Sequence, residues 1–456
     1  MPKKKTALTI EERLQQALVP AEEQPYEVPE NWVWVRLGAV CFFENGYAFK
    51  SDKFSSEKGI PVIRISNIKE NNVDLDDCIK TLEENIDEKF IVHQGDLLIA
   101  MSGATTGKNG VYMSANIAYL NQRVGNIKVK NKELLIEKFR NFYIANMQNE
   151  ILNTAYGGAQ PNISSQKMSV MTFPLPPLSE QQRIIERIEV LFAKLDEAKE
   201  RLQEVADSFA VRKAAILHKA FMGELTKQWR RENGVSDESW EEKTIGEICS
   251  SLKYGTSKKS SDDGEVVVLR MGNLQNGEID WSNLAYTSDE EDIKKYLLKS
   301  GDVLFNRTNS PELVGKTSIY RGEMPAIYAG YLIKLDYEKN IVVGDYLNYY
   351  LNSSKAKEYY MQVKTDGVSQ SNINAKKIGE FEIPLPTLSE QHEIVRLIDD
   401  LLARERAAQQ AAEQALASID LMKKSILARA FRGELGTNKA SEASALELLK
   451  QVLAEN

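Results

Sequence analysis

The stretch Pro174–Gln181 (PLPPLSEQ) decides the fold, because it returns almost unchanged as Pro384–Gln391 (PLPTLSEQ). Each copy opens a long run of residues with helical periodicity. Solenoid repeats recur every ~20 to 50 residues, whereas these two copies lie much farther apart. The sequence therefore predicts a duplicated domain, with each copy followed by a long helix.

A second motif marks where those helices end. Ala220–Leu225 (AFMGEL) returns as Ala430–Leu435 (AFRGEL). Glycine is the residue that most easily takes the left-handed conformation just after a helix, so Gly223 and Gly433 are predicted to terminate the helices.

The bulk composition bounds the class of protein. The chain has 456 residues, and its 42% hydrophobic and 27% charged residues are typical of a soluble globular protein. We expect no membrane span, since no apolar run approaches ~20 residues, and no signal peptide, since no apolar region follows the basic residues Lys3–Lys5. Three cysteines give no disulfide framework and favour the cytoplasm. The net charge of −8 argues only weakly against DNA, because binding needs a local basic patch rather than a basic total.

The repeats predict two similar globular domains of mixed α/β (α+β) structure, separated by two long helices packed as an antiparallel coiled coil. The expected order is an N-terminal arm of short helix and linker (1–29), a first domain (30–177), a long helix (178–227), a second domain (228–387), a second long helix (388–435) and a tail helix (436–456).

The first long helix is expected to run from about Leu178 to Phe221, and apolar residues in alternating steps of four and three predict the coiled-coil seam. The seam residues that we expect to pack or to meet a partner are Ile184, Ile188, Leu191, Leu195, Leu202, Phe209, Ile394, Ile398, Leu401 and Ile419, with Val205 and Ala408 between them. Glu405 interrupts the pattern without an evident reason. At ~1.5 Å per residue the seam is roughly 50 Å long.

Both chain ends contain signals for short helices. Thr9 and Glu12 form a capping-box pattern, followed by a possible apolar stripe of Ile10, Leu14 and Leu18. The arm is interpreted either as a docking segment or as a frayed terminus. Ser444 and Glu447 suggest a capped helix in the tail.

No catalytic constellation is evident. The three histidines have no metal-site spacing, and we expect no metal and no cofactor. Ser310–Thr317 (SPELVGKT) resembles a phosphate-binding loop, but serine replaces its first glycine and Pro311 removes an amide donor. Its sister loop, Gly103–Asn109, is shorter and lacks the Ser/Thr ligand for Mg²⁺. A nucleotide hydrolase is therefore the weakest of the functions considered.

The same loops are rich in side chains that read DNA. Arginine and lysine match guanine, and asparagine and glutamine match adenine. The candidate DNA-binding residues are Arg64, Asn67, Ser102, Thr105, Lys108, Asn109, Gln160, Asn162, Arg270, Asn273, Asn306, Arg307, Asn309, Lys316, Gln370 and Asn372. Ordinary polar turns would have a similar composition, and Arg64 and Arg270 could equally form structural ion pairs.

These features together resemble the specificity (S) subunit of type I restriction–modification systems. The resemblance rests on two domains, each followed by Pro-Leu-Pro-x-Leu-Ser-Glu-Gln and a helix ending in Ala-Phe-x-Gly-Glu-Leu, and it spans about Trp32 to Leu435. It implies two target recognition domains, each reading half of a bipartite site in double-stranded DNA. It also implies binding to two DNA methyltransferase (M) subunits and to restriction (R) subunits, which would supply the methyl-donor and ATP chemistry.

Two other functions remain open on the sequence alone. A stand-alone tandem DNA-binding regulator would bind its site without a partner. A coiled-coil scaffold would join proteins and ignore DNA.

Overall fold

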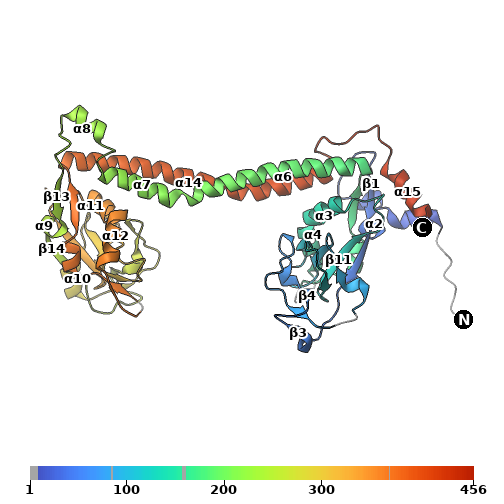
Figure 1. Ribbon diagram of the computed structural model, residues 1–456, viewed down its shortest axis with the longest axis horizontal. Helices are drawn as coiled ribbons and strands as arrows, with labels where there is room; N and C mark the ends of the chain where they lie inside the picture. The colour runs from blue at the N-terminus through green and yellow to red at the C-terminus, as the bar shows by residue number, and fades with distance from the viewer. Residues whose placement is uncertain (1–8, 84–85, 157–160, 369, 456) are drawn as a thin grey trace. The chain divides into compact units, whose positions relative to one another are not determined.

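The chain forms two compact units in the computed structural model, which describes residues 9–83, 86–156, 161–368 and 370–455 (Figure 1). The first unit comprises residues 1–201 together with 415–456, and the second comprises residues 202–414. Within the described residues no helix has both the length and the apolar character that crossing a membrane requires.

The first unit is built on two five-stranded sheets. One has the order β2-β11-β8-β9-β5 and the other the order β3-β6-β4-β10-β7. The strands of the first sheet are β2 (Cys41–Asn45), β5 (Asn71–Asn72), β8 (Leu97–Ala100), β9 (Asn109–Val111) and β11 (Val124–Val129). Those of the second are β3 (Phe54–Ser55), β4 (Ile60–Ile63), β6 (Lys80–Thr81), β7 (Ile91–Val92) and β10 (Ala118–Leu120). A separate antiparallel pair joins β1 (Val33–Arg36) to β12 (Thr172–Leu175). The proline motif, which begins at Pro174, therefore starts inside β12 and leads from this strand into the long helix.

The second unit repeats this plan with shorter sheets. Its main sheet has the order β14-β23-β19-β21, formed by β14 (Cys249–Tyr254), β19 (Val303–Asn306), β21 (Thr317–Ile319) and β23 (Leu332–Tyr337). A second sheet contains β15 (Val266–Leu269), β18 (Tyr286–Thr287) and β22 (Ala326–Tyr328). The pair of β13 (Glu241–Thr244) and β26 (Glu382–Leu385) is the counterpart of β1 and β12.

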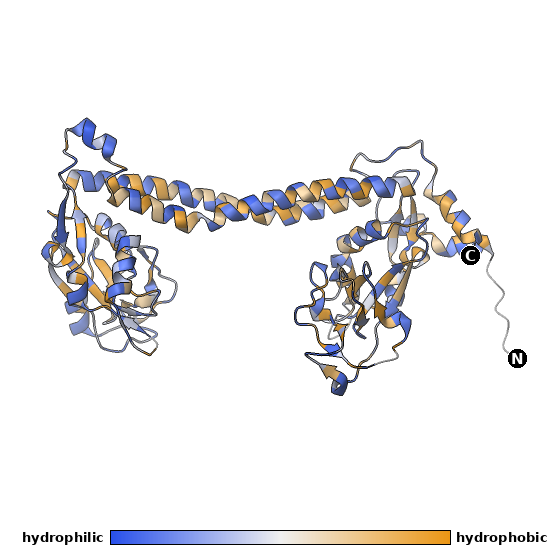
Figure 2. Cartoon of the chain, viewed as in Figure 1, coloured by the Kyte–Doolittle hydropathy of each residue, from blue (hydrophilic) through white to orange (hydrophobic). Residues whose placement is uncertain are grey.

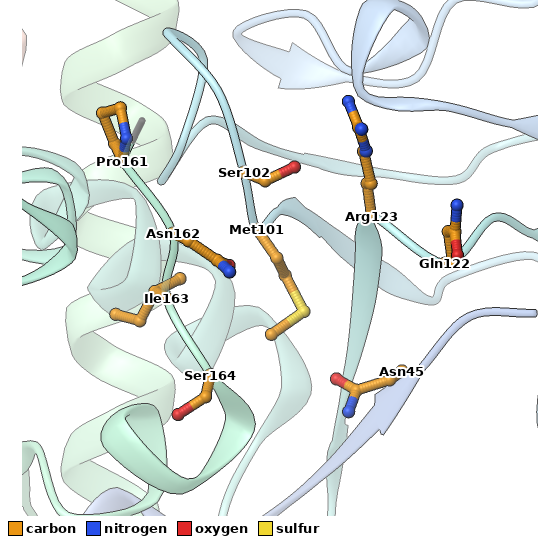
Figure 3. A pocket seen from close by; sticks show the side chains of 9 residues that line it. All are labelled: Asn45, Met101, Ser102, Gln122, Arg123, Pro161, Asn162, Ile163 and Ser164. Carbon is orange, nitrogen blue, oxygen red and sulfur yellow. The ribbon is translucent and has the colours of Figure 1, made fainter. Parts of the chain in front are cut away.

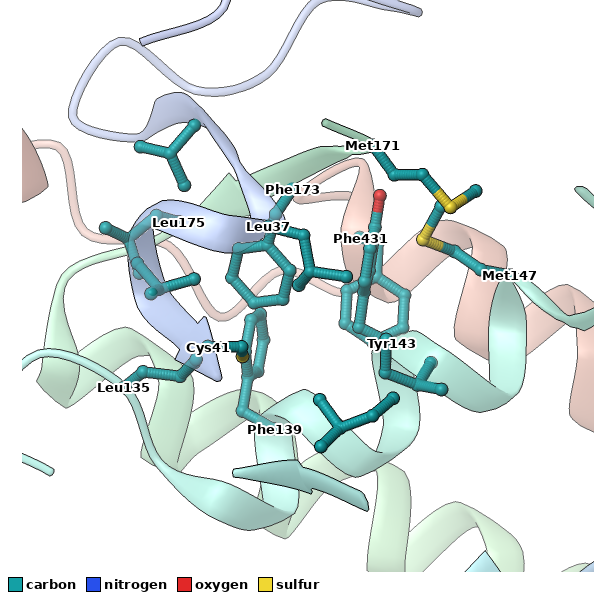
Figure 4. Packing of buried hydrophobic residues seen from close by; sticks show 14 of the residues in the cluster. Leu37, Cys41, Leu135, Phe139, Tyr143, Met147, Met171, Phe173, Leu175 and Phe431 are labelled. Atoms are coloured by element: carbon teal, nitrogen blue, oxygen red, sulfur yellow. The ribbon is translucent and has the colours of Figure 1, made fainter. Parts of the chain in front are cut away.

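The phenylalanine of each Ala-Phe-x-Gly-Glu-Leu motif anchors a long helix in an aromatic core. Phe431 ends α14 (Leu388–Phe431), and its ring lies 5.3 Å from that of Phe139 and 4.9 Å from that of Tyr143 (Figure 4). Phe221 ends α7 (Phe209–Phe221) and meets Tyr346 and Tyr350 at 5.3 and 4.9 Å. Each helix end is thus fixed by edge-to-face aromatic contacts in the unit where it terminates.

The predicted glycine stops are confirmed. Gly223 and Gly433 have φ values of 72° and 73°, which other residues rarely adopt. A Cβ atom on Gly433 would also lie 2.5 Å from Pro29. Both glycines are therefore required by conformation, and Gly433 by space as well.

The long helices pair antiparallel within each unit, as predicted. In the first unit, α6 (Leu178–Asp207) meets the end of α14 through the ion pairs Asp196–Lys423 and Lys199–Asp420. In the second unit, Arg212 of α7 meets Glu405 of α14 at 2.6 Å. The earlier Asp196 pairs with the later Lys423, and the later Lys199 pairs with the earlier Asp420, so the two helices run in opposite directions. The Arg212 ion pair explains why Glu405 interrupts the apolar pattern.

The predicted first long helix is confirmed, with one irregular residue, Ser208, between its two segments. α6 ends at Asp207 and α7 begins at Phe209. At the break the Ser208 hydroxyl and the Arg212 guanidinium both donate to the carbonyl of Val205. A serine side chain that bonds back to a carbonyl of the preceding turn bends a helix, which accounts for the irregularity.

Part of the predicted seam was wrong. Ile184, Ile188, Ile394, Ile398 and Ile419 are buried as expected. Leu401, however, is only half-buried, and its neighbour Leu402 fills the core, so the step after Ile398 is four residues rather than three. Val205 and Ala408 are exposed, while the remaining seam residues are half-buried: Leu191, Leu195, Leu202 and Phe209.

The two chain ends meet in the first unit. α1 (Ile10–Ala17) has the predicted Thr9–Glu12 capping box, and it lies beside α15 (Ala445–Glu455), the predicted tail helix (Figure 1). Leu14 and Leu18 pack on the core, but Ile10 is exposed, so the stripe is shorter than expected. The described part of the arm, from Thr9 onward, is therefore docked on the first unit. The matching connection in the second unit is α8 (Lys227–Asn233), which is hydrophilic (Figure 2).

Candidate functional site

In the first unit, two polar loops that are distant in sequence meet where β8 ends. The amide of Gly103 donates to the carbonyl of Pro161 at 2.9 Å, and the amide of Ile163 donates to that of Met101 at 2.9 Å. Ser102 and Asn162 form an isolated bridge between these contacts. Met101 in turn donates to the carbonyl of Arg123, which precedes β11. Backbone pairing therefore extends the sheet by one segment at its end and gathers the loops there.

A cavity of about 540 Å³ opens at this sheet end (Figure 3). Its lining is largely polar and comprises Asn45, Met101, Ser102, Gln122, Arg123, Pro161, Asn162, Ile163 and Ser164. Asn162 and Arg123 come from separate segments on either side of Met101 (Figure 3). This arrangement of donors and acceptors around a concave surface suits a polar ligand with hydrogen-bonding edges.

The second unit gathers its loops in the same way. Strand β20 (Thr308–Asn309) pairs with β25 (Ser371–Asn372), and the amide of Ile373 donates to the carbonyl of Arg307 at 2.9 Å. The backbone amide of Arg307 donates to the backbone carbonyl of Tyr331 at 3.0 Å, just as the amide of Met101 donates to the carbonyl of Arg123. Arg307 thus stands at the position of Met101, and Tyr331 at that of Arg123.

The Arg307 side chain is oriented by two contacts. Its guanidinium lies 4.8 Å from the ring centre of Tyr254, and its Nη1 donates to the carbonyl of Gly330 at 3.3 Å. Stacking on an aromatic ring holds the planar guanidinium while leaving other N–H groups for a ligand. Tyr331, beside it, is 50% exposed.

Most predicted site residues lie on or near these two sheet ends. Lys108, Asn162 and Gln370 are exposed, and Ser102, Thr105, Arg307, Asn309 and Asn372 are half-buried. Lys316 is also half-buried and donates to Gln275 at 2.9 Å. Asn372 donates to the hydroxyl of Thr308 at 2.8 Å, which links the two loops of the second unit. Gln160 lies outside the described residues.

Four of the asparagines predicted to contact DNA are buried in the fold instead. Asn67 and Asn273 are buried, and each accepts a hydrogen bond from the amide of Arg64 or Arg270, which closes a short 3₁₀ turn. Asn109 and Asn306 are buried at 4% and 0% exposure inside their own loops. Burial leaves these amides no surface for a base edge, so we withdraw all four as direct contacts.

Arg64 and Arg270 are half-buried beside those turns. Arg270 donates to both the carbonyl and the side-chain oxygen of Asn283 at 3.2 Å. Neither arginine forms an ion pair with any residue in the described part of the chain. The ion-pair alternative raised for them is therefore not what holds them.

In the loop that resembles a phosphate-binding loop, backbone amides donate hydrogen bonds to carbonyls of the same segment. Leu313 and Val314 donate to the carbonyl of Ser310, and Gly315 donates to that of Asn306 at 2.8 Å. Gly315 has φ 91°, and a Cβ there would lie 2.2 Å from the ring of Tyr360. The Gly-Lys pair is thus explained by a tight turn against a helix, and these amides do not cradle a phosphate.

The repeated Leu-Ser-Glu-Gln motif holds each unit together. The Gln181 side chain accepts from the amide of Ile136 at 2.9 Å and donates to the carbonyls of Leu134 and Pro176. Gln391 makes the equivalent three bonds with Val343, Ile341 and Pro386. Each glutamine therefore satisfies buried backbone groups at the start of a long helix.

The neighbouring glutamates fasten the chain that follows each Gly-Glu-Leu. Glu390 accepts from Thr226 at 2.7 Å and from Arg230 at 2.6 Å, and Glu180 accepts from Thr437 at 2.7 Å and from Arg183 at 2.7 Å. Burial raises the pKa of Glu180 despite these donors. In the first unit this contact anchors the C-terminal tail.

Three residues at the sheet ends were missed by the sequence analysis: Arg123, Tyr254 and Tyr331. Each lies outside the motifs shared by the two halves, so the repeat gave no reason to single it out. The only sequence signal for them is their residue type, since arginine and tyrosine are common in recognition surfaces.

Two copies of one α+β domain, each with a polar site at the end of its main sheet and a long helix after it, define a tandem recognition protein. The family model for the type I restriction modification DNA specificity domain matches residues 29–207 and 237–415. The chain therefore belongs to the type I restriction–modification DNA specificity family, and it is a target-recognition subunit with two recognition domains.

Individual relatives agree over most of the chain. The type I restriction enzyme EcoBI specificity subunit of Escherichia coli is 28% identical over 458 residues, covering 94% of this chain and 93% of the relative. The EcoKI specificity subunit of Escherichia coli strain K12 is 27% identical, covering 94% of this chain and 96% of the relative. The crystal structure of the HsdS subunit from Thermoanaerobacter tengcongensis has the same fold, with a TM-score of 0.60 and 21% identity, covering 91% of this chain and 100% of that chain.

Proposed function

We propose that each unit reads one half of a bipartite DNA target through the polar site at its sheet end, and that the two half-sites differ in sequence. The observation that carries this proposal is the exchange of side chains at equivalent positions. The first unit has Met101 and Arg123 where the second has Arg307 and Tyr331. One scaffold with different recognition groups reads different base edges, which predicts an asymmetric target.

The residues proposed to contact bases are the predicted candidates on the loops at the two sheet ends that are exposed or half-buried. They are Asn162 in the first unit and Arg307, Asn309 and Asn372 in the second, with Ser102, Thr105 and Gln370 beside them. Lys108 and Lys316 are proposed to hold phosphates, which fix the position of the protein on the duplex without specifying sequence.

We further propose that the long helices bind the methyltransferase subunits. Large apolar side chains are exposed on them, among which Val211 is 70% exposed in the second unit and Leu421 is 67% exposed in the first. Met422, next to Leu421, is 50% exposed as well, and neighbouring apolar side chains exposed on a helix favour a protein partner. Restriction subunits would join the same assembly, and methyl transfer and ATP-dependent cleavage would reside in those partners. The three free cysteines support a cytoplasmic location.

The test is an exchange of one domain. The chain is expressed with its methyltransferase partner, residues 30–177 are replaced by the corresponding domain of a relative, and methylated bases are mapped across the host DNA. We expect one half-site to change and the other to remain. A change in both halves would refute independent reading by the two units.

The same preparation separates the two remaining alternatives. A regulator that works alone would bind its site equally tightly without the methyltransferase. A scaffold would form the complex but give it no preference for any DNA sequence.

A further inference from the structure

We infer that Arg123 is a specificity-determining residue that reads guanine in the first half-site. Each unit then has an arginine in its own site, but the two arginines stand on different segments of the shared fold. The inference rests on the proposed function and assigns it a residue and a base. It comes from comparing the two sheet ends position by position.

The backbone fixes the comparison. Met101 donates to the carbonyl of Arg123 and accepts from Ile163, while Arg307 donates to the carbonyl of Tyr331 and accepts from Ile373. The second unit therefore carries its guanidinium on the segment that leaves the strand, β19. The first unit carries an apolar methionine there and has its arginine on the adjacent turn, immediately before β11.

Arg123 is available for a ligand. It is exposed, it lines the cavity of about 540 Å³, and no described residue forms a side-chain hydrogen bond or ion pair with its guanidinium. By contrast, Arg36 and Arg183 of the first unit are engaged with Glu23 and Glu442. An exposed guanidinium at a cavity attracts an anionic or acceptor-rich partner.

The surroundings favour a base edge over a phosphate alone. Asn45, Gln122 and Asn162 line the same cavity, and they present neutral amides rather than further positive charges. The Ser102 hydroxyl is buried there without a hydrogen-bond partner among the described residues. Guanine presents two adjacent acceptors in the major groove, which a guanidinium can satisfy with two parallel bonds, and neighbouring amides can read the next base.

The two units also differ in how the arginine is held. Tyr254 and the Gly330 carbonyl orient Arg307 before any ligand arrives, whereas Arg123 has no such support among the described residues. Ordering Arg123 on binding costs side-chain entropy that Arg307 has already lost. The first unit should therefore discriminate less steeply at its guanine than the second does at the base read by Arg307.

The experiment uses the full chain in complex with its methyltransferase partner and a DNA library randomised in the first half-site. R123A should remove the preference for guanine at one position, a loss of about 5- to 150-fold, with the second half-site unchanged. R123Q should move the preference at that position toward adenine, because glutamine matches adenine N6 and N7. K132A, which removes an exposed lysine paired with Glu137, is the matched control and should change nothing.

The outcomes separate cleanly. An equal loss of affinity for all sequences, with a smaller salt dependence, would make Arg123 a phosphate contact and overturn the inference while the proposed function stands. An unchanged profile for both R123A and R123Q would also overturn it. Absence of sequence preference in the unaltered complex would instead defeat the proposed function. Since R123Q keeps a polar side chain at an exposed position, the measurement survives if R123A does not fold.

Discussion

The buried glutamate of the second Leu-Ser-Glu-Gln motif should be among the most expensive side chains to remove. Glu390 is fully buried, and its Oε1 accepts from Thr226 at 2.7 Å and from Arg230 at 2.6 Å. The Arg230 side chain is only 8% exposed, and its second partner, Asp237, lies in solvent. E390A would leave a buried guanidinium and a buried hydroxyl without their acceptor, at a cost of about 3–5 kcal/mol in the free energy of unfolding.

The first unit supplies an internal comparison. At Glu180 the arginine is 24% exposed and keeps both bonds to Glu442 when the glutamate is lost. E180A should therefore cost less, about 1–3 kcal/mol. Hydrogen exchange resolved by peptide measures the opening free energy of each unit separately, which a single melting curve would not. The losses should appear in the second unit for E390A and in the first for E180A.

A triple variant tests the physical reason. In T226V/R230M/E390L all three polar groups are removed together, including the Glu390 Oε2 atom, which is buried without a partner among the described residues. Stability should return to within about 2 kcal/mol of the unaltered protein, because the penalty comes from stranded groups rather than from a net favourable ion pair. A triple variant as unstable as E390A, or an E180A variant less stable than E390A, would refute the reasoning.

Three other predictions follow from the sites described. R307A should relax base preference at one position of the second half-site by roughly 1–3 kcal/mol, measured by competition among half-site variants, and a uniform loss with a weaker salt slope would make it a phosphate contact. V211D and L421D should reduce recovery of the methyltransferase with the chain, whereas V170D, on an exposed domain residue, should not; equal recovery for all three would exclude these helix surfaces. D336N should destabilise the second unit at neutral pH, because burial is outweighed by hydrogen bonds from Lys253, Lys334 and Ser251, which lower the pKa of Asp336 to about 2. That stability is present above the ordinary carboxyl pKa and is lost as the pH falls toward 2, so unfolding curves of the two proteins should converge there.

The sequence was most informative where it repeats itself. Two copies of the proline motif and of Ala-Phe-x-Gly-Glu-Leu were enough to predict the two domains, the antiparallel helices and the glycine stops, because helix termination is a local property. The sequence was less informative about which apolar residue faces inward. A strict alternation of four and three steps predicts Leu401 rather than Leu402, because it ignores local shifts in helix packing.

The recognition site was only partly predictable for a similar reason. Polar loop composition singled out loops that the structure brings together at each sheet end, but composition does not distinguish an asparagine that closes a turn, such as Asn67, from one that faces solvent, such as Asn162. That distinction depends on burial, which only the assembled sheet determines. Arg123 was missed because its role depends on a neighbouring strand rather than on its own sequence context.

The distribution of the two units along the chain has a consequence for biosynthesis. The second unit is one continuous segment, residues 202–414, whereas the first requires residues 415–456 to complete it. Domains usually mature in the order in which they leave the ribosome. Here the order is inverted: the second unit can finish while the first still waits for Thr437 to reach Glu180. A chain released before residues 415–456 are made would therefore carry a finished second unit and an incomplete first one, which closes only when Thr437 can bond to Glu180.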